Sequence, residues 1–185
     1  MIIWITGMSG SGKTTLGSEI VRLLKNKEKS VVFVDGDNFR QYFSAQLGYS
    51  LEDRKENLRR IRDLCRFLDS QSIDAVCSVL SLFPGTEEEN RNDFRNYYEI
   101  SLEVPFDLLL KERDYKGLYH KAIAGETSNV VGVDLPFYSP KKPDLVIQNT
   151  SSKGDFLHHA ETIVSRLFPS GLLVKTEWLH KPVAI

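Results

Sequence analysis

The sequence predicts an α/β fold built on a doubly wound parallel sheet, because short apolar runs alternate along the chain with segments of helical periodicity. Apolar runs of this length without polar alternation are typical of strands that are buried on both faces. Strands that alternate with helices imply right-handed crossovers, with helices on both faces of the sheet. The predicted strands cover residues 2–6, 31–34, 73–80, 97–104 and 145–147.

Three helices are predicted from periodicity. Apolar residues recur three and four positions apart within residues 16–24 and again within 58–68. The second pattern follows Ser50, which with Glu52 and Asp53 resembles a capping box. A last helix is expected over residues 156–167, ending near Pro169.

The chain length of 185 residues fits one domain with a complete hydrophobic core, which we expect over residues 1–170. Residues 113–143 differ in kind, since they are rich in Gly, Lys and Pro and have no strand pattern. A long irregular stretch inside a domain is usually functional, so this one is interpreted as a lid. Residues 171–185 form a tail that is either a small edge element or a mobile end.

Composition excludes several classes of protein. A net charge of −1 gives no general attraction for nucleic acid or an anionic membrane. No apolar run approaches the roughly 18–20 residues of a membrane helix, and residues 1–5 lack the basic region of a signal peptide. The two cysteines, Cys65 and Cys77, match no metal or disulfide pattern and are expected to be buried. We therefore expect a cytoplasmic protein with no nucleic-acid or membrane partner.

Residues 7–14 match the P-loop pattern G-x-x-x-x-G-K-[ST] at every fixed position, after a predicted strand and before a predicted helix. Glycines let the backbone curl around a phosphate, and the helix N-terminus adds partial positive charge. The lysine can reach the β- and γ-phosphates, and the threonine hydroxyl can bind Mg²⁺. The predicted ATP-binding residues of this segment are Gly7, Ser9, Gly10, Ser11, Gly12, Lys13, Thr14 and Thr15.

Phosphate binding alone leaves three classes open: a kinase, a GTPase-type switch and a nucleotide-binding module without chemistry. A GTPase should carry an Asn-Lys-x-Asp motif after a late strand, and residues 146–150 lack it. A module without chemistry should have lost the acidic residues near the phosphates. The sequence therefore favours a P-loop nucleoside-triphosphate kinase that uses Mg²⁺ with ATP.

Two carboxylates, Asp35 and Asp37, follow the second predicted strand, where ligands bind in open α/β sheets. Asp35 is expected to hold the magnesium ion through water, together with Thr14. Asp37 is expected to act as a catalytic residue beside Lys13, orienting the acceptor hydroxyl and taking its proton. The alternative is a tight turn in which Asp37 is a helix N-cap.

Several further segments resemble the adenylyl-sulfate kinase family. They are Asp-Gly-Asp-Asn-Phe-Arg at 35–40, Leu-Gly-Tyr-Ser at 47–50, Asp-Arg-Lys-Glu-Asn at 53–57 and Arg-Asp-Tyr-Lys-Gly-Leu-Tyr at 113–119. With the P-loop they recur in family order over roughly residues 1–150. The resemblance implies transfer of the γ-phosphate of MgATP to the 3′-hydroxyl of adenylyl sulfate, and a homodimer, since members are commonly dimers.

The resemblance also implies roles for individual residues. Acceptor-binding residues would be Asp37, Arg40, Arg54 and Asn57, with Tyr49 stacking on the base, Lys116 and Lys121 contacting phosphates from the lid, and Val130 in the place of a second stacking aromatic. Arg113 would contact ATP where the lid begins. Ser81 matches a family serine that is sometimes assigned as a phosphoserine intermediate, and direct transfer makes it an acceptor contact instead. The alternatives are a solvated helix face for Arg54, ordinary packing for Tyr49 and a solvated face for the lid lysines.

Two departures from the family lie on the acceptor side. Val130 replaces a phenylalanine, and the loop at residues 81–85 reads Ser-Leu-Phe-Pro-Gly, without the family's arginine. Adenylyl sulfate stays the first choice of acceptor because the motif match is broad. The alternative is a pyrimidine-activated compound such as cytidine diphosphoramidate, and the alternative of another class is a non-catalytic nucleotide-binding paralogue.

Overall fold

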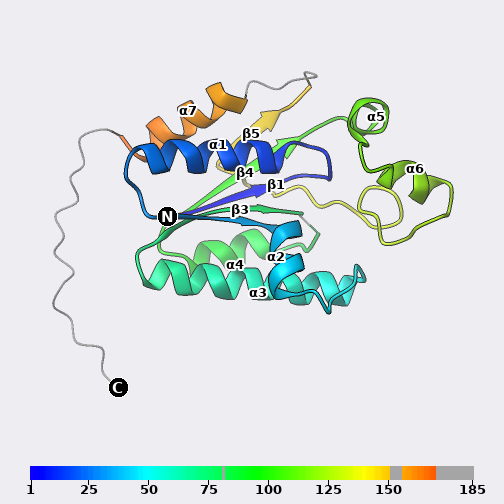
Figure 1. Cartoon of the computed structure of the whole chain (residues 1–185), viewed down its shortest axis with the longest axis horizontal. Helices are drawn as coiled ribbons and strands as arrows, with labels where there is room; N and C mark the ends of the chain where they lie inside the picture. The colour runs from blue at the N-terminus through cyan, green and yellow to red at the C-terminus, as the bar shows by residue number, and fades with distance from the viewer. Residues whose placement is uncertain (81, 151–155, 170–185) are drawn as a thin grey trace.

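Five parallel strands form one sheet in the order β2-β3-β1-β4-β5, with helices on both faces (Figure 1). The computed structural model describes residues 1–80, 82–150 and 156–169. The strands are β1 (Ile2–Thr6), β2 (Val31–Asp35), β3 (Asp74–Val79), β4 (Tyr97–Glu103) and β5 (Leu145–Gln148). Each lies within one or two residues of its predicted position, so the doubly wound parallel sheet is confirmed.

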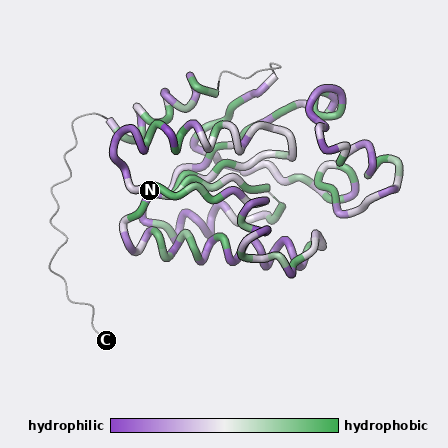
Figure 2. Tube along the Cα trace, in the orientation of Figure 1, coloured by the Kyte–Doolittle hydropathy of each residue, from purple (hydrophilic) through white to green (hydrophobic). Residues whose placement is uncertain are grey.

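Burial of the strands depends on their place in the sheet. The three central strands are buried along nearly their whole length, as predicted. On the outer strands Val32 is 36% and Val146 is 46% exposed, so burial on both faces was wrong for β2 and β5. These strands have a neighbour on one side only, and the helices cover them incompletely. Figure 2 shows hydrophobic residues concentrated along the central strands.

Helices α1 (Lys13–Asn26) and α7 (Phe156–Leu167) cover one face of the sheet, and α3 (Leu51–Ser70) covers the other (Figure 1). These are the three predicted helices. Ser50 is the N-cap of α3, since its Oγ accepts the Asp53 backbone N–H at 3.1 Å. The two cysteines are buried as expected, Cys65 on α3 and Cys77 on β3, with their sulfur atoms 3.3 Å apart.

Further helices lie where no periodic pattern predicts them: α2 (Gly36–Phe43), α4 (Thr86–Asp93), α5 (Phe106–Leu108), the π-helical turn η1 (Leu109–Arg113) and α6 (Leu118–Ile123). The tight-turn alternative at Asp37 is wrong. Asp35 is the N-cap of α2, and its Oδ1 accepts the backbone N–H groups of Asp37 and Asn38.

The predicted lid projects beyond the carboxyl ends of the strands and carries α6 (Figure 1). Leu109, Tyr119 and Val130 form a small buried cluster there, separate from the two clusters on the faces of the sheet. Met8 of the P-loop packs against it, and a Cβ at Gly132 would lie 2.1 Å from the Met8 methyl group. The lid is therefore folded around its own apolar centre in this structure. The tail at 171–185 lies outside the described residues.

No helix in the described ranges has both the length and the apolar character needed to cross a bilayer.

Candidate active site

A cavity of about 350 Å³ opens at the carboxyl ends of β2 and β3, between the P-loop, α2, α3 and the lid. Its volume is in the range of small-molecule sites. Twelve of the predicted site residues line it: Ser9, Gly10, Gly12, Lys13, Thr14, Thr15, Asp35, Asp37, Arg40, Tyr49, Arg54 and Asn57, with Lys116 from the lid as a thirteenth. Segments more than 100 residues apart in the sequence thus share one cavity.

The P-loop has the backbone geometry that its glycines allow. Gly10 and Gly12 have φ angles of 77° and 99°, in the left-handed region. A Cβ at Gly12 would also lie 2.3 Å from the Phe156 ring, so only glycine fits. Lys13 opens α1 and donates from Nζ to the Met8 carbonyl at 2.7 Å.

Burial lowers the pKa of Lys13 to about 8, while Asp37 and Asp35 act in the opposite direction. The low pKa reflects an ammonium group that has lost water without gaining a full counter-charge. Phosphate oxygens would supply that charge and raise the pKa again. The site is therefore electrostatically suited to an anion of high charge density.

Thr14 and Asp35 lie side by side at this site. The Thr14 Oγ1 hydroxyl donates to Asp35 Oδ2 at 2.7 Å. Mg²⁺ typically takes one or two protein oxygen ligands and completes its octahedron with water and substrate phosphates. A hydroxyl and a carboxylate beside the P-loop fit that donor set. In the described residues no cluster of three or more His, Cys, Asp or Glu side chains offers another metal site.

Asp37 lies in the first turn of α2, with its side chain 75% exposed to the cavity and solvent. Lys116 of the lid reaches it from Nζ at 3.3 Å, and that side chain is 76% exposed. Both groups are free to rearrange, because an exposed ion pair of this kind contributes little stability. The pair joins the lid to α2 at the edge of the cavity.

Tyr49 lies beneath two guanidinium groups. The Arg40 and Arg54 guanidinium carbons are 4.9 and 5.3 Å from its ring centroid. Arg54 also donates to the Asn129 carbonyl at 2.7 Å, which links α3 to the lid. Burial and the neighbouring Arg40 charge lower the pKa of Arg54. Two cations this close favour an anionic ligand between them.

Asn57 lies on α3 and is 6% exposed. Its Oδ1 has no hydrogen-bond partner among the described residues, although Asn57 lines the cavity. A buried amide that lacks a partner at a cavity wall is suited to contact a ligand.

Five predicted site residues do not line the cavity: Gly7, Ser11, Arg113, Lys121 and Val130. Ser11 of the P-loop and Arg113 are both bonded to Asn149, whose Nδ2 donates to the Ser11 carbonyl at 2.9 Å and whose Oδ1 accepts from Arg113 at 3.3 Å. Lys121 is an exposed residue of α6. Ser81 lies outside the described residues.

Val130, predicted to lie in the place of a second stacking aromatic, is buried within the lid, and its role in acceptor binding stays a prediction. Its side chain is 3% exposed and packs in the lid cluster with Leu109 and Tyr119. A base could not reach it in this arrangement, so the position does not offer a second stacking surface.

Apolar cavity residues were missed by the sequence reasoning. Leu58 and Ile61 of α3, Leu80, Leu82 and Phe83 after β3, and Tyr115 of the lid all line the cavity. For Leu58 and Ile61 a signal exists in the sequence: they lie four and seven residues after Arg54, and residues so spaced share a helix face.

Comparison with known proteins finds one matching family model and relatives that are named as kinases. The family model described as adenylylsulphate kinase matches residues 1–148. A cytidine diphosphoramidate kinase from Campylobacter jejuni is 37% identical over 166 residues, which cover 90% of this chain and 95% of that protein. An adenylyl-sulfate kinase from Halothermothrix orenii is 38% identical over 146 residues, covering 79% and 78% of the two proteins.

A solved structure of an APS kinase is also similar to this chain. The Mycobacterium tuberculosis APS kinase CysC, in complex with AMPPNP and APS, is similar with a TM-score of 0.79 at 32% identity, covering 90% of this chain and 96% of that chain.

Proposed function

Because this chain belongs to the adenylylsulphate kinase family, and is thus a phosphotransferase that uses ATP and an alcohol acceptor, we propose that it phosphorylates the 3′-hydroxyl of an activated nucleotide, with adenylyl sulfate as first choice. One observation carries the proposal: Lys13 of the P-loop and Asp37 face the same cavity, whose acceptor wall carries Arg40 and Arg54.

Each group has a role in direct transfer between two bound nucleotides. Asp37 orients the acceptor hydroxyl and accepts its proton, while Lys13 and the P-loop backbone stabilise charge on the transferred phosphoryl group. Lys116 leaves Asp37 and moves to the phosphates when the lid closes. Ser81 contacts the acceptor and forms no covalent intermediate.

Thr14 and Asp35 would hold Mg²⁺, Asp35 through water. The ion would neutralise charge on the β- and γ-phosphates. The hydrogen bond between the two side chains sets both oxygens on the same side of the P-loop.

A second acceptor, cytidine diphosphoramidate, is favoured by two observations. The relative of that name matches 90% of the chain at 37% identity. The loop at residues 81–85 also lacks the arginine of the family pattern, which weakens recognition of the sulfate end of adenylyl sulfate.

The test is a coupled ATP-consumption assay with adenylyl sulfate, cytidine diphosphoramidate and their parent nucleotides as acceptors. Phosphorus NMR of the product then reads the position of the new phosphate. We expect a 3′-phosphorylated product and a clear preference for one of the two activated nucleotides. ATP binding without transfer to any acceptor would contradict the proposal and favour a non-catalytic nucleotide-binding paralogue.

A further inference from the structure

Helix α4 is unusual in this fold because it has no apolar side chain to bury. Its sequence is Thr-Glu-Glu-Glu-Asn-Arg-Asn-Asp, and Asn90 is its one buried residue. None of the hydrophobic clusters in the described part of the chain includes an α4 residue. The hydrophobic effect, which positions the longer helices, therefore cannot position this one.

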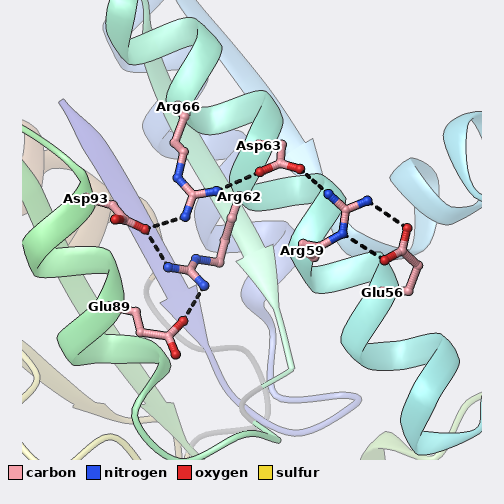
Figure 3. A network of polar contacts seen from close by, with 7 residues as sticks. All are labelled: Glu56, Arg59, Arg62, Asp63, Arg66, Glu89 and Asp93. Carbon is pink, nitrogen blue, oxygen red and sulfur yellow. Dashed lines mark hydrogen bonds and ion pairs between the residues drawn. The ribbon is translucent and has the colours of Figure 1, made fainter.

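Ion pairs attach α4 to α3 instead (Figure 3). Arg62 of α3 contacts both Glu89 and Asp93, the latter at 2.5 Å, and Arg66 contacts Asp93 at 2.5 Å. The Arg62 side chain is only 13% exposed. Exposed ion pairs contribute little, but a mostly buried guanidinium that bridges two carboxylates is held in one geometry.

The other side of α4 holds the end of the lid segment. Glu87 Oε2 accepts the Lys141 backbone N–H at 2.7 Å. Arg91 donates to the Lys142 carbonyl at 2.9 Å and pairs with Asp144 at 2.9 Å. Residues 141–144 connect the lid to β5, so α4 fixes the point where the lid returns to the sheet.

The start of α4 is joined to the wall of the cavity. The Thr86 hydroxyl donates to the Phe83 carbonyl at 2.9 Å. Phe83, together with Leu80 and Leu82, lines the cavity beside Arg54 and Asn57. A displacement of α4 would therefore move this loop relative to α3.

We propose that α4, held to α3 and to residues 141–144 by these polar contacts, sets the width of the acceptor side of the cavity, with Arg62 as its positioning residue. We call this set of contacts the bracket. The inference rests on the proposed function, because it assigns the wall formed by α3 and the loop after β3 to the acceptor. ATP binds on the P-loop and α1, which α4 does not touch through any of these contacts. Loss of the bracket therefore changes acceptor affinity and spares ATP affinity.

The variant to test is Arg62→Met, which keeps the aliphatic stem, removes the ion pair to Glu89 and leaves Asp93 paired with Arg66 alone. The matched control is Arg59→Met, because Arg59 lies one turn earlier in the same network and, among the described residues, forms its ion pairs within α3, with Glu56 and Asp63 (Figure 3). We expect Arg62→Met to raise KM for the better acceptor roughly five- to twentyfold, with KM for ATP and kcat within about twofold. Arg59→Met should leave all three within about twofold.

Hydrogen exchange on the same two variants, measured on the peptide covering residues 82–94, gives a readout without turnover. Faster exchange in Arg62→Met than in Arg59→Met supports the bracket. Equal exchange, an unchanged acceptor KM, or an equal rise in both KM values overturns it. If the wild-type protein transfers phosphate to no acceptor, the proposed function fails, and exchange alone decides whether Arg62 holds α4.

Discussion

Asp37 is the residue on which the proposed chemistry depends most. Its carboxylate is exposed, and it pairs with the lid lysine Lys116 rather than with a group of the P-loop. Asp37→Asn keeps the shape and removes the proton acceptor. We expect kcat to fall about 10²- to 10⁴-fold, with ATP affinity within about twofold of wild type. Steady-state kinetics and ATP titration, both with Mg²⁺ present, measure the two quantities.

Lys13→Ala is the control for Asp37→Asn, because it removes charge from the ATP side of the same cavity. It should lower kcat by about 10²- to 10³-fold and also weaken ATP binding. If Asp37→Asn instead abolished binding of ATP with Mg²⁺, Asp37 would belong to the metal site and the division of roles with Asp35 would be wrong.

At the residue scale, cavity residues were predicted best where a sequence motif lies directly beside a predicted strand or helix. The P-loop, Asp35 and the start of α3 each combine a residue pattern with an adjacent strand or helix, and each contributes residues to the cavity lining. Val130 and Lys121 depend instead on how the lid folds back on itself. No local pattern encodes that arrangement, and neither residue lines the cavity in this structure, so their roles in acceptor binding stay predictions.

The internal packing of the lid decides what a larger side chain at residue 130 would do to stability and to acceptor specificity. Val130 is 3% exposed beside Leu109 and Tyr119, and Tyr119 also donates from its hydroxyl to the Ser9 carbonyl at 2.8 Å. Val130→Phe therefore overpacks the cluster at a cost of about 1–3 kcal/mol and adds no stacking surface. We expect the melting temperature to fall by roughly 3–10 °C, without a gain in kcat/KM for adenylyl sulfate.

Val133→Phe is the matched control for this substitution, since Val133 is 36% exposed in the same loop. It should change the melting temperature by no more than about 2 °C. An unchanged melting temperature in Val130→Phe, together with a higher kcat/KM for adenylyl sulfate, would return Val130 to the acceptor site.

At the element scale, prediction succeeded for strands and long helices and failed for short polar ones. The strands are apolar runs, and α1, α3 and α7 bury apolar stripes that produce a period. α2, α4 and α6 are eight residues or fewer and bury one residue each. Their positions are set by a cap, by ion pairs or by the lid cluster, which are tertiary features.

At the scale of the whole molecule, one buried carboxyl group connects stability to pH. Glu99 is 2% exposed on β4, opposite Trp4 of β1, and its Oε2 has no partner within the described residues. Burial, followed by the nearby Glu87 charge, raises the pKa of Glu99 to about 7, while Arg91 opposes the shift. The folded protein therefore keeps this proton up to higher pH than the unfolded chain, whose value is near 4.5.

The sign of the effect follows from proton binding. Between pH 4.5 and about 7 the folded state binds more protons at Glu99 than the unfolded state. The contribution of Glu99 to the free energy of unfolding therefore falls as pH rises. The slope cannot exceed about 1.4 kcal/mol per pH unit for one proton. Glu99→Gln removes this titration, so the free energy of unfolding of the variant relative to wild type should increase from pH 5 to pH 8 and level off above pH 8.

Urea unfolding at several pH values measures this difference in the free energy of unfolding, with the exposed Glu88→Gln as control. A difference between Glu99→Gln and wild type that stays constant across this range would show that Glu99 is ionised in the folded protein throughout and that burial does not raise its pKa.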